Sequence, residues 1–125
     1  NLFLKKRRNI ANIYNKYLDN KNLTLPIEKD YAKSSYHLYV VLVNSRKKIV
    51  RDNLINFLKK NKIFTNIHYK PIHLQPYFKK FGFKKGDFKN AEEYYQRAIS
   101  LPIHPNLQKK EVMMVIKKIN KFFKK

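Results

Sequence analysis

The segment YHLYVVLV, residues 36–43, has the strongest strand signal in the chain. Its aromatic and β-branched residues favour extended backbone, and its nearly continuous apolar character is typical of a strand in the middle of a covered sheet. Immediately after it, Asn44 and Ser45 are predicted to cap a helix that ends at Asn61. The apolar residues of that helix repeat with the helical period: Ile49, Val50, Leu54, Phe57 and Leu58. A second strand is predicted over Ile63–Tyr69, and two prolines soon after it exclude a regular continuation.

Three further segments have the apolar spacing of amphipathic helices. The first is predicted over Leu2–Leu18 and is followed by a linker. The second is entered through a capping box of Asn90 and Glu93, and its apolar stripe is Ala91, Tyr94, Tyr95, Ala98 and Ile99. The third starts at Asn106 and has lysines opposite its apolar side, which is Val112, Val115, Ile116, Ile119, Phe122 and Phe123. Residues 100–105 contain two prolines and are predicted as an extended connector or a short edge strand.

These elements predict one α+β domain over residues 1–125, with a small sheet of few strands covered by helices. Residues 1–25 would form a leading helix and linker, and residues 26–125 the core. With 43% hydrophobic residues, a chain of this length can bury a substantial core. Both glycines fall in residues 81–87, which are predicted as a surface loop. The chain has no Cys, so disulfides and thiolate metal ligands are excluded, and no apolar run approaches the roughly 20 residues of a membrane span.

The chain is strongly basic, with 29 Lys and Arg against 8 Asp and Glu and a formal net charge of +21. Together with nine Tyr and nine Phe, this charge is typical of proteins that follow phosphates and stack bases, so a freestanding nucleic-acid-binding module is the alternative hypothesis. However, only five basic residues are Arg, the residue that specific readers of nucleic acid favour. The lysines accompany abundant Asn and Ile, as in A- and T-rich genomes. We interpret most of them as solvated helix faces, and the basic last helix as packed on the sheet rather than on a membrane.

Few side chains have the spacing of a catalytic site. His68 and His73 are separated by a spacing that fits neither a helix face nor a strand face, and no ligand set for a metal is complete. Glu92 and Glu93 are adjacent and diverge on a helix, no serine lies in a nucleophile turn, and there is no glycine-rich phosphate loop. The remaining candidates are His68 and Tyr69, at the end of a predicted strand. The His68 imidazole can donate or accept a hydrogen bond near neutral pH, and Tyr69 offers a hydroxyl group and an aromatic face for stacking. The alternative that both only cap a sheet edge stays open.

The order and spacing of YHLYVVLV, RDNLINFLKKNKIFTNIHYKPIHLQPYF and AEEYYQRAISLPIHPNL resemble the C-terminal part of the DegT-type sugar-nucleotide aminotransferases, which depend on pyridoxal phosphate. The N-terminal KKRRNIANIYNKYL is similar to the helix that leads into the small domain of that family. HYKPIHLQPYF and FGFKKGDF are most similar to the branch that acts in pseudaminic acid biosynthesis and flagellin glycosylation. The resemblance covers essentially the whole chain.

The resemblance implies the small domain of a fold-type I aminotransferase whose large domain, upstream of this chain, holds pyridoxal phosphate. Such an enzyme transfers an amino group from glutamate to a UDP-linked 4-keto-6-deoxy-N-acetylhexosamine. It would be a cytoplasmic homodimer without membrane or nucleic-acid partners. In the family the lysine that binds the cofactor covalently belongs to the large domain. We therefore expect no catalytic, cofactor-binding or metal-binding residue in this chain, which would be inactive alone.

The resemblance also implies which residues contact substrate. In the family, the segment that matches Asn66, Ile67, His68 and Tyr69 closes over the sugar nucleotide, so these four residues are the expected substrate-binding residues. His73 is a second-rank candidate. The two remaining histidines are expected to make structural hydrogen bonds: His37 and His104.

Overall fold

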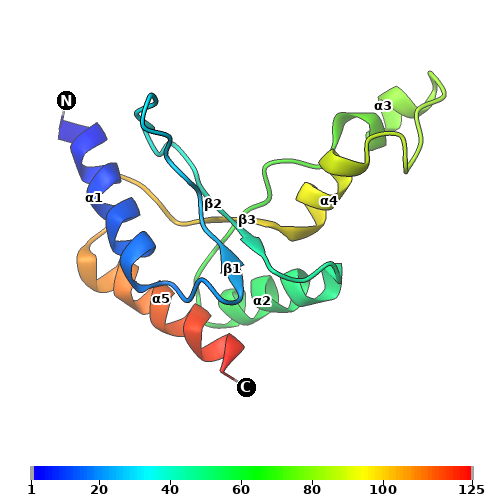
Figure 1. Cartoon of the computed structure of the whole chain (residues 1–125). Coiled ribbons are helices and arrows are strands. Elements are labelled where there is room, and N and C mark those ends of the chain that lie inside the picture. Colours follow the sequence, from blue (N-terminus) through cyan, green and yellow to red (C-terminus); the bar gives the residue numbers. More distant parts are fainter. Residues whose placement is uncertain (1, 125) are drawn as a thin grey trace.

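The computed structural model describes residues 2–124 and has a three-stranded antiparallel sheet with strand order β1-β2-β3 (Figure 1). Its strands are β1 (Leu23–Thr24), β2 (Tyr39–Val43) and β3 (Ala98–Leu101). The central position of β2 confirms the prediction for this segment, and the small sheet with covering helices confirms the predicted α+β class. The strand is shorter than predicted because Tyr36 has a φ of 46°, in the left-handed region that a strand cannot contain. Extended pairing therefore starts at Tyr39.

One face of the sheet packs on three helices: α1 (Leu2–Tyr17), α2 (Lys48–Lys60) and α5 (Lys109–Phe123). Alternate residues of β2 point into this core, because side chains alternate between the faces of a strand. Figure 1 shows α1 and α5 side by side beneath the sheet. The sheet contributes the following buried residues to this core: Leu23, Tyr39, Val41, Val43, Ile99 and Leu101.

The last helix has the predicted apolar side. Its buried residues are Val112, Val115, Ile116 and Ile119, with Phe122 and Phe123 packed against them. The helix starts later than predicted, since Gln108 is the N-cap residue and forms a capping box with Glu111. Its apolar side belongs to the hydrophobic core, which favours core packing over a membrane surface. No helix in the described residues is long and apolar enough to cross a membrane.

Helix α2 ends at Asn61, as predicted, and the Asn61 side-chain amide donates to the Phe57 carbonyl oxygen at 2.8 Å. The predicted caps are wrong, because α2 begins at Lys48 and the preceding residue makes no capping hydrogen bond. Four of the five predicted apolar residues contact the core, since Leu54 and Leu58 are buried and Val50 and Phe57 pack against them. Ile49 is 59% exposed, whereas Arg51 is only 1% exposed. The sequence pattern counts only apolar residues, so it could not predict that the charged Arg51 occupies a core position.

The predicted strand over 63–69 is wrong, because these residues form only an isolated bridge between Asn66 and Ser100. The chain then makes two short helices that were not predicted, η1 (Ile72–Leu74) and α3 (Pro76–Lys79). Pro76 stands at the start of α3, where a missing N–H costs nothing. The predicted loop with both glycines is confirmed, and Gly82 and Gly86 have φ values of +90° and +101°.

Helix α4 (Lys89–Arg97) lies where a helix was predicted, but the capping box and the apolar stripe are wrong. The helix begins before Asn90, and no side chain caps it. Ala98 and Ile99 belong to β3, because their backbone pairs with β2. The buried residue of α4 is Glu92. Tertiary pairing thus overrode the helical period at the end of this segment.

Figure 1 shows α3 and α4 in an arm that extends away from α1 and α5. Arg51 ties this arm to α2. Its Nη1 donates to the carbonyl oxygens of Tyr95 and Ala98 at 3.0 and 3.4 Å. Its Nε donates to the Asp52 carboxylate at 2.7 Å, and its guanidinium carbon lies 5.5 Å from the centroid of the Tyr95 ring. Arg97 donates from its Nε to the Val43 carbonyl oxygen at 2.9 Å. Two arginines therefore fix the direction in which the chain enters β3.

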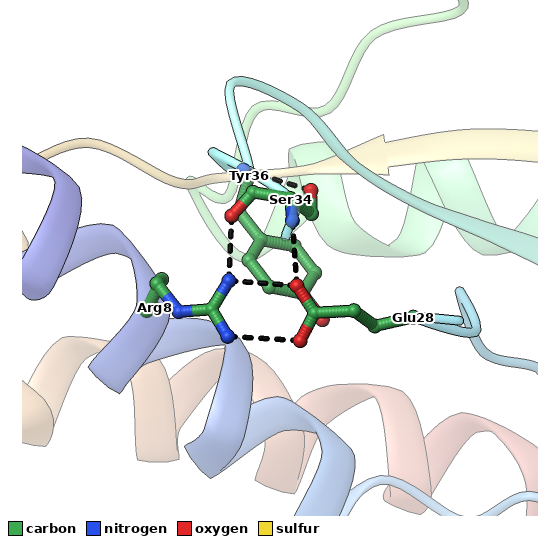
Figure 2. A network of polar contacts seen from close by, with 4 residues as sticks. All are labelled: Arg8, Glu28, Ser34 and Tyr36. Atoms are coloured by element: carbon green, nitrogen blue, oxygen red, sulfur yellow. Dashed lines mark hydrogen bonds and ion pairs between the residues drawn. The ribbon is translucent and has the colours of Figure 1, made fainter. Parts of the chain in front are cut away.

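The connection between β1 and β2 is fastened to α1 by an ion pair (Figure 2). Arg8 donates from Nη1 and Nη2 to the two carboxylate oxygens of Glu28 at 2.7 and 2.8 Å. Arg8 also donates to the Ser34 carbonyl oxygen at 2.7 Å, and the Ser34 N–H donates to Glu28 at 2.6 Å. The Arg8 hydrogen bond, assisted by the Ser34 N–H, lowers the pKa of Glu28 to about 2. This long loop is therefore anchored at a charged pair.

Candidate functional site

The segment Asn66–Tyr69 lies beside β3 and is fixed to it through Ser100. The Ser100 N–H donates to the Asn66 carbonyl oxygen at 2.8 Å, and the Asn66 N–H donates to the Ser100 carbonyl oxygen at 3.2 Å. These two hydrogen bonds make the isolated bridge. The segment therefore takes its position from the sheet although it is not a strand.

The side chains of this segment are accessible. Asn66 and Tyr69 are exposed, with Tyr69 at 75%, whereas Ile67 and His68 are half-buried. The peptide bond between His68 and Tyr69 is cis, and the two rings meet edge to face with centroids 4.7 Å apart. The four expected substrate-binding residues therefore lie at the surface, outside the hydrophobic core.

His68 is held from both ring nitrogens. Its Nδ1 lies 2.7 Å from the Ser100 Oγ, and its Nε2 lies 3.3 Å from the Asn66 Nδ2. Ser100 is 5% exposed, and its side chain is on the face of β3 opposite Ile99. The sheet thus positions the imidazole through one buried hydroxyl.

These residues border an open hollow of about 320 Å³. Its lining combines polar groups with aromatic and aliphatic groups: His37, Leu38, Phe64, Thr65, Asn66, His68, Ser100, Leu101, Pro102 and Ile103. A few polar groups among apolar walls are typical of sites for small organic ligands. The Thr65 hydroxyl in this lining is buried and makes no hydrogen bond with residues 2–124. The hollow can therefore hold part of a ligand that has both hydroxyl groups and an apolar face.

His73 is not brought together with these residues. It is buried in the arm, where its Nε2 lies 2.9 Å from a Glu92 carboxylate oxygen and its ring packs 4.8 Å from that of Phe88. The same carboxylate oxygen accepts the Gly86 N–H at 2.6 Å. The hydrogen bond from His73, then that from Gly86, lowers the pKa of Glu92. His73 thus joins η1 to α4 and to the glycine loop, which is a structural arrangement.

The prediction of structural hydrogen bonds for His37 and His104 is wrong. Both residues are exposed, and neither ring makes a hydrogen bond within residues 2–124. His37 instead lines the hollow. Ser100 is the residue that sequence reasoning missed, and the available signal was a single hydroxyl within the otherwise apolar run Ala98–Leu101.

The hollow does not fit pyridoxal phosphate on its own. An imine with the cofactor needs a lysine in the cavity, and the lining of the hollow contains none. Phosphates are commonly bound by Arg or Lys side chains, and neither residue type lines the hollow. Across residues 2–124, no three His, Cys, Asp or Glu side chains are grouped as metal ligands.

The chain is similar in sequence to an aminotransferase family and to several of its relatives. The model of the DegT/DnrJ/EryC1/StrS aminotransferase family matches residues 1–120. An uncharacterized protein of Methanocaldococcus jannaschii, MJ1066, is 45% identical over 94% of this chain and 31% of its own length. The UDP-4-amino-4,6-dideoxy-N-acetyl-beta-L-altrosamine transaminase of Campylobacter jejuni is 33% identical over 90% of this chain and 30% of its own length.

Solved structures of aminotransferases are also similar to this chain. PseC of Helicobacter pylori, described as an aminotransferase involved in the biosynthesis of pseudoaminic acid, superposes with a TM-score of 0.86 at 32% identity, over 98% of this chain and 33% of its own. A putative sugar aminotransferase of Streptococcus pneumoniae, Spr1654 in its PLP form, gives 0.91 at 28% identity, over 98% of this chain and 31% of its own. The chain spans about a third of the length of the proteins that it matches.

Proposed function

Because the chain belongs to the DegT/DnrJ/EryC1/StrS aminotransferase family, we propose that it is the C-terminal small domain of a pyridoxal-phosphate-dependent sugar-nucleotide aminotransferase. The observation that carries the proposal is the position of Asn66–Tyr69. The resemblance implies that this segment closes over the sugar nucleotide, and in this structure Asn66 and His68 line an open hollow with the exposed Tyr69 next to them. Pyridoxal phosphate supplies the amino-group chemistry when it is bound. The lysine and phosphate contacts that it needs belong to another part of the protein.

The role of this domain is to bind and orient the sugar. The Asn66 amide and the Tyr69 hydroxyl are neutral polar groups suited to sugar hydroxyls, and the Tyr69 ring offers a face for stacking. Tyr69 is presented by a segment that the sheet fixes, so little entropy is lost on binding. Covering the sugar from this side would exclude water and align the keto group, which is the kind of positioning that accounts for much of a catalytic rate.

The substrate that we propose is a UDP-linked 4-keto-6-deoxy-N-acetylhexosamine, with glutamate as amino donor. The likeness to the C. jejuni transaminase and to H. pylori PseC supports this substrate and a place in pseudaminic acid biosynthesis, which leads to flagellin glycosylation. In this proposal the protein acts as a cytoplasmic homodimer. His73 is left out of the substrate contacts, because its ring is buried against Glu92.

The experiment is a kinetic comparison on the complete protein that contains these residues. Tyr69→Ala removes an exposed ring that packs against His68, whose side chain lines the hollow. Tyr31→Ala removes a ring that is 90% exposed elsewhere and serves as the matched control. We expect Tyr69→Ala to raise the KM for the sugar nucleotide by roughly tenfold, as the loss of about 1.4 kcal/mol of binding requires. Tyr31→Ala should leave it unchanged. Equal kinetics for the two variants would overturn the placement of the substrate.

A further inference from the structure

We propose that Ser100 is a positioning residue, whose hydroxyl oxygen accepts a hydrogen bond from Nδ1–H of His68, in the tautomer that the Asn66 amide selects, and thereby fixes the orientation of the imidazole at the edge of the hollow. The identity of the ligand that contacts this ring rests on the proposed function. The assignment of the tautomer does not, because it follows from four hydrogen-bonding groups within the chain.

The orientation of the Asn66 amide is fixed by the backbone of the next residue. The Asn66 Oδ1 accepts the N–H of Ile67 at 2.8 Å, and this contact identifies which end of the amide is oxygen. The Nδ2 end therefore faces His68, where it lies 3.3 Å from Nε2. An amide NH₂ group only donates hydrogen bonds, so the neutral ring must accept at Nε2.

The position of the ring proton follows from the chemistry of imidazole. A neutral ring that accepts at Nε2 has its proton on Nδ1. That proton points to the Ser100 Oγ, 2.7 Å away, so the serine oxygen is the acceptor. Residues 2–124 offer the Ser100 hydroxyl no other side-chain hydrogen-bond partner, so its own proton remains available at the wall of the hollow.

The backbone that carries the Ser100 hydroxyl is held on both sides. Ser100 is 5% exposed, its backbone pairs with Val40 of β2 on one side, and it exchanges two hydrogen bonds with Asn66 on the other. A hydroxyl held this firmly loses little freedom when it accepts a hydrogen bond. Recognition groups supported in this way are more precise than groups on free loops. Ser100 therefore determines the orientation of His68 and the donor that the hollow presents.

The test is a long-range ¹H–¹⁵N NMR spectrum of the ¹⁵N-labelled chain near neutral pH, which reports protonation at each ring nitrogen. For His68 we expect a protonated Nδ1 and an unprotonated Nε2. In Ser100→Ala the Asn66 amide still donates to Nε2, so Nδ1 should stay protonated, but its proton loses its acceptor and should exchange with water faster. The exposed rings of His37 and His104 give internal references, and Ser35→Ala, at an exposed serine, is the matched control.

A second variant does not disturb the buried serine. Asn66 is exposed, and Asn66→Asp places a carboxylate acceptor against Nε2, so this nitrogen should gain a proton. An unprotonated Nε2 in Asn66→Asp would overturn the proposal. So would a protonated Nε2 in the unmodified chain, or a His68 Nδ1 proton that exchanges no faster in Ser100→Ala than in the unmodified chain.

The two proposals fail separately. The NMR measurement contains no sugar and no cofactor, so it does not depend on the aminotransferase assignment. If His68 lacks the expected tautomer while Tyr69→Ala still raises the KM, the role of Ser100 is wrong and the proposed function stands. If the tautomer is found while Tyr69→Ala and Tyr31→Ala behave alike, the substrate placement is wrong and the role of Ser100 stands.

Discussion

Replacement of Arg51 by Met is expected to destabilise the domain more than any change at an exposed arginine. The Arg51 side chain is 1% exposed and links α2 to the arm by donating to the carbonyl oxygens of Tyr95 and Ala98. Met fills much of the same space without a donor. The substitution therefore leaves two backbone acceptors without their side-chain partner and removes one of the two cations beside Asp52.

The size of the effect follows from these partners. Removal of one member of a fully buried ion pair costs about 3–5 kcal/mol. Asp52 is 32% exposed and keeps Lys48 at 2.8 Å, so its charge stays compensated and the cost is below that range. The orphaned acceptors cost about 1–3 kcal/mol each when they are buried without water. We expect a loss of about 2–3 kcal/mol, against a total of about 6–19 kcal/mol for a chain of this length.

The assay is unfolding followed by circular dichroism, with urea and with heat. At about 4 °C per kcal/mol for a domain of this size, Arg51→Met should lower the Tm by about 8–12 °C. Arg51→Lys retains the charge but not the planar guanidinium, so its Tm should lie between that of the unmodified chain and that of Arg51→Met. Arg46→Met, at an exposed arginine, is the control and should stay within about 0.5 kcal/mol of the unmodified chain. A loss below about 0.5 kcal/mol for Arg51→Met would refute the reasoning.

Tyr14→Phe should cost about 1 kcal/mol in urea unfolding, because the Tyr14 hydroxyl donates to the Pro102 carbonyl oxygen at 2.8 Å, and an unchanged midpoint would contradict this role. Arg8 and the Ser34 N–H lower the pKa of Glu28 to about 2, so the stabilisation is fully present above the ordinary carboxyl range near 4.5 and is lost as the pH falls toward 2. The Tm of the unmodified chain should therefore fall more steeply over this window than that of Glu28→Gln, and parallel curves would exclude the linkage. Borohydride reduction of the 125-residue chain with pyridoxal phosphate should give no adduct at a unique lysine, and mass spectrometry would reveal one. Titration with single-stranded DNA at low and moderate salt should give a weak response, whereas tight binding that falls steeply with salt would favour the nucleic-acid alternative.

The parts of the fold that sequence predicted are those whose stability comes from a local apolar pattern. Residues 39–43 pair as a central strand, and the last helix has the expected buried face. These two predictions are confirmed because an apolar face is buried in the core whichever element packs against it. The errors occur where long-range contacts decide. Ala98 continues the helical period of α4, yet the backbone of β2 offers it strand pairing.

The candidate site was predictable only in part, for the same reason. The resemblance placed Asn66–Tyr69 as substrate contacts, and the structure shows that these residues are accessible. It also gave His73 as a second-rank candidate, and in the structure a buried glutamate from α4 holds that ring. Ser100 lies more than thirty positions after His68, and only the fold brings the two side chains together. No local pattern contains that contact.

The most direct test of the central claim is amino transfer by the complete protein that contains these 125 residues. Transfer from glutamate to a UDP-linked 4-keto-6-deoxy-N-acetylhexosamine would be followed by mass spectrometry, beside the 125-residue chain alone with pyridoxal phosphate. The account predicts an aminated sugar nucleotide from the complete protein and none from the chain alone. No product from the complete protein with any keto-sugar nucleotide, or turnover by the chain alone, would contradict it.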